Sequence, residues 1–187
     1  MTSTTSTTGT IQVFTYKDGL LARLAHDLRL TLGRFEIQRD GASVQARFWP
    51  GSLHVDGAID RRGQLDTDTL SDSDRRKIGE NIAEHVLHLD RFPEASFRGQ
   101  IVGGGAVEGE LTLAGRSAAV RVPVQAAGGR LRGEVTLVPS RWGIAPYKAL
   151  AGAIKLQDRV LVVLDLPADP AGSGSADTPA VCSWTAG

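Results

Sequence analysis

The chain has 187 residues, which is enough for one domain with a hydrophobic core of its own. Lysine plus arginine and aspartate plus glutamate each number 21, so no net charge attracts nucleic acid or an anionic membrane. No apolar run approaches the roughly 20 residues that a membrane-spanning helix needs. We therefore expect a protein that neither binds nucleic acid nor inserts stably into a membrane.

The two ends of the chain differ in composition from the middle. Residues 1–9 are rich in serine and threonine and are predicted to be a disordered tail. They lack the basic and apolar regions of a secretory signal peptide, which predicts a cytoplasmic location. Residues 167–187 are rich in proline, glycine and serine and are predicted to be a flexible tail. The folded domain is expected over residues 10–166.

Nine segments of that domain have the two-residue alternation and the length of β-strands. They are Thr10–Tyr16, Asp27–Glu36, Ala42–Trp49, Ser52–Ala58, Ala95–Val102, Ala106–Leu113, Arg116–Val124, Arg130–Pro139 and Val160–Leu166. Short turns join several of them, so these neighbours are expected to pair antiparallel. Residues 19–26 fit both a helical and an extended pattern, and we expect a short helical turn there that enters a strand.

One helix is predicted, over about residues 73–88. Ile78, Ile82 and Val86 follow one another at intervals of four and form an apolar stripe. Pro93 ends this unit just beyond. We expect the stripe to pack on the sheet or across one mouth of a barrel.

These elements predict a mainly β protein, an antiparallel barrel of about eight strands with one α-helix. Eight strands is the number at which a closed barrel can hold one small ligand. Alternation alone does not distinguish a barrel that is filled by its own side chains from one that is hollow. A filled structural barrel that acts through a protein partner is therefore one alternative.

The histidines give little indication of catalysis or of a metal site. His26 directly precedes Asp27, where a predicted strand begins, and adjacent residues on a strand point to opposite faces. His85 and His88 are three residues apart near the helix end, but no third ligand follows at a recognisable spacing. We expect no catalytic residue, no metal and no cofactor. A small enzyme or stress-response protein that uses these histidines is the other alternative.

The longest irregular segment inside the domain, residues 140–150, is unusually apolar for a loop. It contains Trp142, Ile144, Tyr147 and Leu150. One interpretation is a loop that caps a barrel end with its own side chains. The other is a lid that meets a lipophilic ligand, and the two interpretations are compatible.

Three motifs, taken in order, resemble one protein family. Phe92–Phe97 reads FPEASF, Gly109–Gly115 reads GELTLAG before an alternating VRVPV strand, and Arg141–Ile144 reads RWGI. Together they resemble the YceI-like proteins, which are also called lipid- or polyisoprenoid-binding. In two segments the chain departs from typical members, namely Arg76–Asp90 and the longer approach to His26.

The resemblance implies an extended, lipocalin-like antiparallel β-barrel with a helix beside it. It also implies a non-catalytic carrier whose partner is a lipophilic small molecule, such as an isoprenoid, a quinone tail or a fatty-acyl chain. A homodimer is a reasonable expectation for this family, and many of its members are periplasmic.

Strand alternation and the two barrel ends supply the candidate ligand-binding residues. They are Phe14, His26, Leu28, Leu30, Leu32, Phe35, Phe92, Phe97, Leu111, Leu113, Val135, Leu137, Trp142 and Ile144. A register shift of one residue would turn a whole strand's set to the other face.

Overall fold

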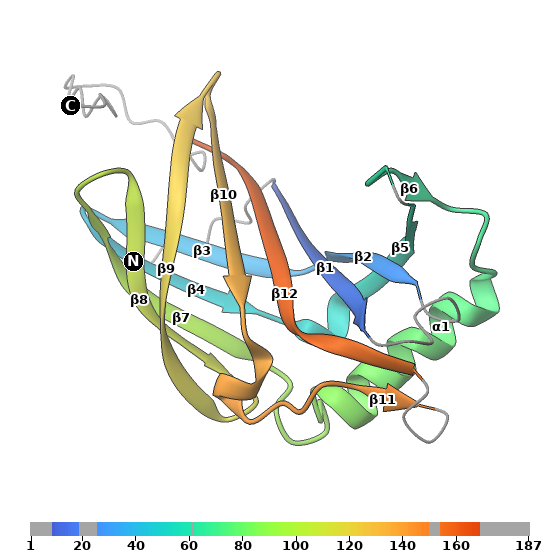
Figure 1. Ribbon diagram of the computed structural model, residues 1–187. Coiled ribbons are helices and arrows are strands. Elements are labelled where there is room, and N and C mark those ends of the chain that lie inside the picture. Colours follow the sequence, from blue (N-terminus) through green and yellow to red (C-terminus); the bar gives the residue numbers. More distant parts are fainter. Residues whose placement is uncertain (1–8, 19–25, 61, 150–153, 169–187) are drawn as a thin grey trace.

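The computed structural model describes residues 9–18, 26–60, 62–149 and 154–168. Over these residues the chain forms one curled antiparallel sheet with a helix beside it (Figure 1). The predicted fold class, mainly β with one helix, is confirmed. Most of the predicted helical turn at 19–26, and nearly all of both predicted tails, lie outside the described residues.

The sheet contains more strands than the predicted eight or so. They are β1 (Thr10–Asp18), β2 (Asp27–Leu32), β3 (Phe35–Asp40), β4 (Ser43–Phe48), β5 (Leu53–Ile59), β6 (Leu65–Asp66), β7 (Ala95–Val102), β8 (Ala106–Leu113), β9 (Arg116–Ala127), β10 (Arg130–Leu137), β11 (Lys148–Ala149) and β12 (Ile154–Pro167). The predicted strand Asp27–Glu36 is in fact two strands. The strands β6 and β11 have two residues each, too few for alternation to reveal them.

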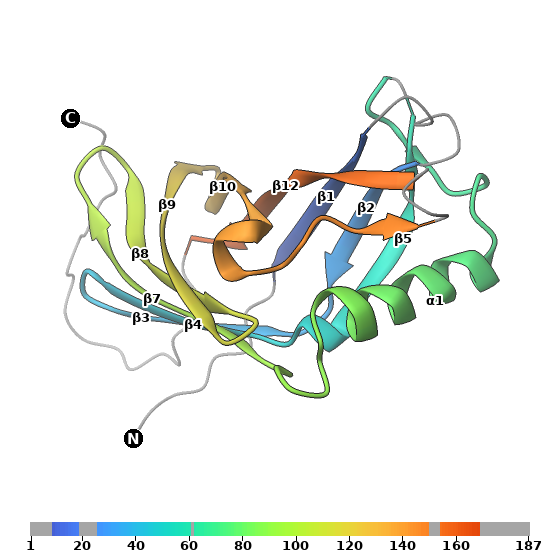
Figure 2. The same ribbon diagram turned by 60° about the horizontal axis from the view of Figure 1, so that its bottom comes forward.

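The order of the strands explains the half-barrel shape. It runs β3-β4-β7-β8-β9-β10-β12-β1-β2-β5-β6, so β2 and β3 lie near opposite ends of the sheet. The Gly33 N–H donates to the Ser52 carbonyl at 3.0 Å, and the Trp49 N–H donates to the Arg34 carbonyl at 3.2 Å. These bonds join the β2/β5 pair to the β3/β4 pair. The four strands thus form one bent ribbon that connects the two ends of the curled sheet (Figure 2).

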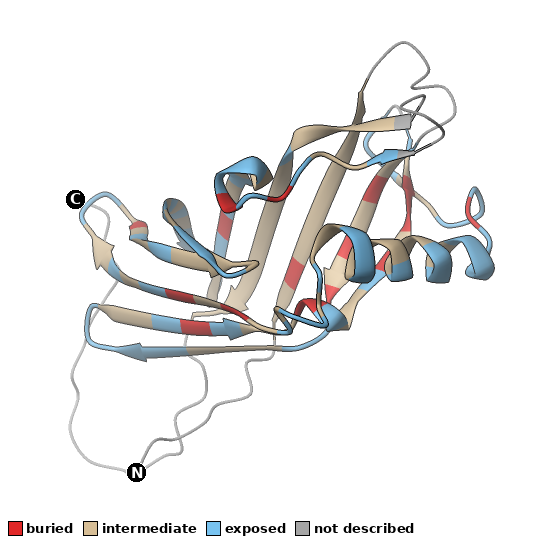
Figure 3. Cartoon of the chain, turned by 90° about the horizontal axis from the view of Figure 1, so that it is seen from below, coloured by how far each residue is buried: buried red, intermediate tan, exposed pale blue. Residues whose placement is uncertain are grey.

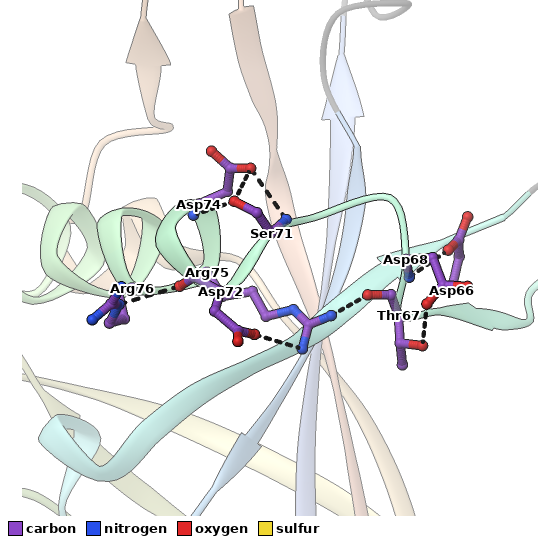
Figure 4. Close-up of polar contacts among 8 residues, drawn as sticks. All are labelled: Asp66, Thr67, Asp68, Ser71, Asp72, Asp74, Arg75 and Arg76. Carbon is purple, nitrogen blue, oxygen red and sulfur yellow. Dashed lines mark hydrogen bonds and ion pairs between the residues drawn. The ribbon is translucent and has the colours of Figure 1, made fainter.

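The helix α1 (Asp72–Asn81) continues into a π-helical turn, η3 (Ile82–Val86), close to the predicted bounds. Ser71 caps its start. The Ser71 hydroxyl accepts from the Asp74 N–H at 3.1 Å, and the Asp74 carboxylate accepts from the Ser71 N–H at 3.2 Å (Figure 4). This reciprocal pair satisfies two backbone donors that the first helical turn leaves free.

The segment before the helix is held by further polar contacts. Arg75 donates to the Thr67 carbonyl, and it lies 3.7 Å from the Asp72 carboxylate (Figure 4). The Asp66 carboxylate accepts from the Thr69 hydroxyl at 2.6 Å. That hydrogen bond, followed by those from backbone N–H groups, lowers the pKa of Asp66. The helix start is therefore fixed beside β6.

The hydrophobic core lies where the helix covers the sheet. Its buried members are Leu28, Leu30, Val55, Ala58 and Leu70, and Ile78 and Ile82 of the predicted apolar stripe pack against them. Figure 3 shows buried positions on the strands that run beside the helix. The helix therefore packs on one part of the concave face of the sheet and does not cover the rest of that face.

Candidate functional site

The concave face of the sheet surrounds a cavity of about 650 Å³. Alternate residues of most strands line it. On β9, Val120, Val122 and Val124 face the cavity, whereas Arg121 and Pro123 between them are exposed on the outer face. The volume falls within the range of roughly 300–1,000 Å³ that is typical of small-molecule sites.

The cavity is elongated. Along β12 its lining runs from Leu156 to Pro167. At about 3.3 Å per residue, that stretch follows roughly 36 Å of strand. The helical segment contributes Ile78, Ile82 and Val86 to the lining. The space therefore suits an extended ligand better than a compact one.

The apolar loop predicted as a cap or lid lies against the cavity. Trp142 and Ile144 are buried, and both face the cavity, as does Tyr147. Trp142 is only 1% exposed, and its Nε1–H donates to the Leu111 carbonyl at 2.7 Å. Arg141 donates to the Ala119 carbonyl at 3.0 Å. The loop is therefore attached to β8 and β9, while contact of this loop with a ligand stays a prediction.

Gly143 explains why the loop can turn at this point. It ends the short 3-10 helix η4 (Pro139–Trp142) in the left-handed conformation, with φ of 76°. A Cβ atom there would lie 2.8 Å from the guanidinium carbon of Arg116. Glycine is thus favoured for both its conformation and its lack of a side chain.

Eleven of the fourteen predicted ligand-binding residues line the cavity. They are His26, Leu28, Leu30, Leu32, Phe97, Leu111, Leu113, Val135, Leu137, Trp142 and Ile144. They come from β2 and the residue before it, from β7, β8 and β10, and from η4 and the loop that follows it. The structure therefore brings these residues together on one surface, and their contact with a ligand stays a prediction.

The orientation expected for Phe14 is corrected by the structure. Its neighbours Val13 and Thr15 both line the cavity, and Phe14 does not. Since successive side chains of a strand point to opposite faces, Phe14 lies on the outer face of β1. The apolar character of Phe14 suggested the wrong face, because this strand also carries apolar residues on its outer side.

Phe35 and Phe92 also lie outside the lining. Phe35 pairs with Phe48 across β3 and β4, and of the two only Phe48 lines the cavity. The ring of Phe92 packs over the β8–β9 turn, where a Cβ atom on Gly115 would lie 2.5 Å from it. Phe92 therefore supports a turn rather than the cavity wall.

Several lining residues were missed by the sequence prediction. Examples are Ile11 and Val13 on β1, Val122 on β9, and Val162 and Leu164 on β12. Their alternation predicted the strands correctly, and it would have identified these residues had it been extended to every strand of the sheet.

Charged groups with a shifted pKa lie away from the cavity. Among the described residues these groups are Arg47, Asp66, Asp74, Glu94 and Asp165, and none of them lines it. Each of the four carboxyl groups has its pKa lowered, mainly by a hydrogen bond from a neighbouring side chain. These groups make structural contacts outside the cavity.

His85 and His88, considered above for metal binding, are both exposed and adjoin a small surface hollow beside Glu84. Within the described ranges, no three histidine, cysteine, aspartate or glutamate side chains are grouped so that they could hold a metal ion.

A family model now decides what kind of protein this is. The model of the YceI-like domain matches residues 31–168, which is most of the chain. The chain belongs to the YceI-like family. The curled sheet, the single helix and the FPEASF, GELTLAG and RWGI motifs are thus features of a YceI-like domain. A search of curated proteins finds no match to this chain.

Solved structures show the same fold at low sequence identity. BcnA of Burkholderia cenocepacia is 16% identical with a TM-score of 0.56, over 84% of this chain and 94% of that one. A polyisoprenoid binding domain from Saccharophagus degradans, implicated in plant cell wall breakdown, is 11% identical with a TM-score of 0.56, over 88% and 95%. The YCEI protein of Campylobacter jejuni is 11% identical with a TM-score of 0.51, over 73% and 81%.

The described part of this YceI-like chain has one α-helix, and that helix is too short and too polar to span a bilayer.

Proposed function

We propose that the protein binds one lipophilic chain, such as an isoprenoid, a quinone tail or a fatty-acyl compound, in the concave cavity, and acts as a non-catalytic carrier. The observation that supports this most directly is the long cavity of about 650 Å³ with its mainly aliphatic lining. The family relation and the polyisoprenoid binding domain among the structural neighbours agree with it.

The energetics require no dense set of polar contacts. Burying one CH₂ group contributes about 0.8 kcal/mol, so a chain of ten carbons gains roughly 8 kcal/mol before the cost of association. Association costs at least about 4 kcal/mol, so a ten-carbon chain is left with about 4 kcal/mol, an affinity of about millimolar. A chain of about 16 carbons gains roughly 13 kcal/mol and would reach about micromolar affinity. Selectivity along the cavity would depend on chain length and width.

The proposal can be tested with two neighbouring substitutions on β10. Val135 lines the cavity, and Thr136 is exposed on the outer face. Val135→Arg places a cation in the apolar cavity and should abolish uptake of a fluorescent prenyl or fatty-acyl probe. Thr136→Arg is the matched control and should bind the probe as the wild type does. Leu111→Arg on β8 should act like Val135→Arg.

Native mass spectrometry of the purified protein supplies the second measurement. We expect a co-purified lipid whose mass is lost in the Val135→Arg variant. No co-purified lipid and no uptake of either probe by the wild type would overturn the carrier proposal and favour a filled barrel.

A further inference from the structure

The polar side chains of the cavity are unevenly distributed. Thr15, His26, Tyr147 and Gln157 line it near the last residues of β1, and we call these four residues the polar end. Asn81 at the end of α1 and Arg39 on β3 are the other polar residues of the described lining. The opposite end is lined mainly by aliphatic side chains. These are Ile37, Val44, Ile101, Val107, Val122, Val124, Leu131, Leu164 and Leu166.

Strand register brings the polar end together. Thr15 pairs with Leu28 of β2 on one side and with Val160 of β12 on the other. His26 lies two residues before Leu28, and both residues line the cavity. The Thr15 and His26 side chains therefore share one region of the cavity wall.

A bulge in β12 adds Gln157 and Tyr147 to this region. Thr15 pairs with Val160, but Lys17 pairs with Leu156, so the register shifts between them. The Gln157 amide donates to the Lys17 carbonyl at 3.0 Å, which holds Gln157 against the end of β1. The Leu156 N–H donates to the Tyr147 carbonyl at 3.1 Å.

The Thr15 hydroxyl is unusual among buried polar groups. In the described part of the chain, Thr15 Oγ1 and Arg75 Nε are the two buried side-chain atoms without a hydrogen-bond partner. An unsatisfied buried hydroxyl lowers stability, and each such group in a folded protein calls for an explanation. Thr15 lines the cavity, so rotation of its side chain would bring the hydroxyl to the cavity surface. A polar atom of a ligand would then supply the missing hydrogen-bond partner.

Charge distinguishes between neutral and anionic ligands. Among the described residues that line the cavity, Arg39 is the one lysine, arginine or carboxylate side chain. It lies on β3, and its Nε donates to the Gly41 carbonyl at 2.9 Å. Of the residues that the structure describes, no lysine or arginine lines the polar end. Burying an anionic head group there without a counter-charge would be costly, whereas a hydroxyl group can both donate and accept.

We propose that the cavity prefers an amphiphile with a neutral terminal hydroxyl, a long-chain alcohol, whose hydroxyl lies at the polar end while the chain extends toward β7–β10. This inference rests on the proposed carrier function. It adds a direction of binding and a class of ligand, with Thr15 as the residue that selects the head group.

The experiment compares hexadecanol with hexadecanoate, which share a chain length and differ in the head group. Each displaces a bound fluorescent probe from the purified full-length protein at pH 7.5. We expect hexadecanol to bind about tenfold more tightly. Thr15→Val removes the hydroxyl at nearly constant shape and should weaken hexadecanol binding about fivefold more than it weakens hexadecanoate binding.

Controls separate the head-group effect from folding. Thr136→Val changes an exposed threonine on the outer face and should leave both affinities unchanged. Thr15→Val removes an unpartnered hydroxyl, so its melting temperature should equal or exceed that of the wild type. His26→Ala alters an exposed residue of the polar end and should also reduce the preference for the alcohol.

The outcomes distinguish the two proposals. Equal affinities for both ligands, unaffected by Thr15→Val, would overturn the head-group inference and leave the carrier function intact. Tighter binding of hexadecanoate would assign an anionic ligand instead, with Lys17 near the end of β1 as a candidate cation among the described residues. Failure of the wild type to bind the probe or either ligand would overturn the carrier function itself.

Discussion

Two regions of the concave face have the same alternating sequence pattern and very different surroundings. On β2, Leu28, Leu30 and Leu32 are buried, and the first two pack in the core beneath the helix. On β8, Leu111 and Leu113 face the same side of the sheet and are only half-buried, because no helix covers them and the cavity lies in front of them. Burial therefore depends on which element covers a strand, and the alternation of the strand itself does not reveal it.

The largest expected effect tests this contrast with one type of substitution at two positions. Leu30→Ala removes a side chain that is 2% exposed and should lower the free energy of unfolding by about 3 kcal/mol. Leu113→Ala on the cavity wall should cost about 1 kcal/mol, because fewer contacts are lost. Urea unfolding measures both. Equal losses would mean that the region in front of β8 is filled by the protein's own side chains.

A substitution at Trp142 weakens the contact between the apolar loop and β8 at the cavity wall. Trp142→Phe removes the hydrogen bond to the Leu111 carbonyl and reduces a fully buried ring. We expect a loss of about 2 kcal/mol in the free energy of unfolding. The control is Trp49→Phe, at a half-buried ring stacked by Arg34 at 4.0 Å, which should cost less than about 1 kcal/mol. A larger loss in the control would contradict this assignment.

The helix cap provides a smaller change on the packed side. Ser71→Ala removes the hydroxyl that accepts from the Asp74 N–H and should lower the free energy of unfolding by about 1 kcal/mol. Ser73→Ala, an exposed position inside the first turn, serves as the control and should be nearly neutral. Probe uptake should persist in both variants. Loss of uptake in Ser71→Ala alone would show that the helix start also shapes the cavity.

Protonation of Asp66 and Asp74 at acid pH should give the smallest loss of stability among these predictions. Hydrogen bonds lower the pKa of Asp66, chiefly from the Thr69 hydroxyl, and that of Asp74, chiefly from the Ser71 hydroxyl. A lowered folded-state pKa gives stability that is present above the unfolded value, about pH 4, and is lost as the pH falls through the folded value. Unfolding midpoints between pH 5 and pH 2 measure this. Asp66→Asn should flatten the decline, and an unchanged slope would argue against the assignment.

Much of the fold was predictable because its signals are local. The strands β7 and β8 have the bounds that alternation and glycine turns predicted, and the helix begins one residue before its expected start. The break between β2 and β3 was missed, although the sequence marks it: the apolar residues change from even positions up to Leu32 to odd positions from Phe35 on. The motif residues Trp142 and Ile144 both line the cavity, which agrees with the expectation that an apolar loop needs a surface to cover.

The candidate site was less predictable, because alternation divides a strand into two faces without showing which face turns toward the cavity. Phe14 looked suitable by its size, yet the face of β1 that carries Val13 and Thr15 is the one that lines the cavity. Gln157 could not be found from the sequence at all, since it reaches the cavity through a register shift between β1 and β12. Such a shift depends on the pairing of strands that are about 140 residues apart in the chain.

The sequence by itself determined the strands, the helix and the apolar faces, because periodicity and capping act between near neighbours. Only the tertiary structure decided that the helix covers one part of the concave face and that the rest of this face surrounds a cavity. It also decided that Thr15, His26, Tyr147 and Gln157 meet at one end of that cavity. These features arise from contacts between distant segments, whose positions depend on the packing of the whole sheet.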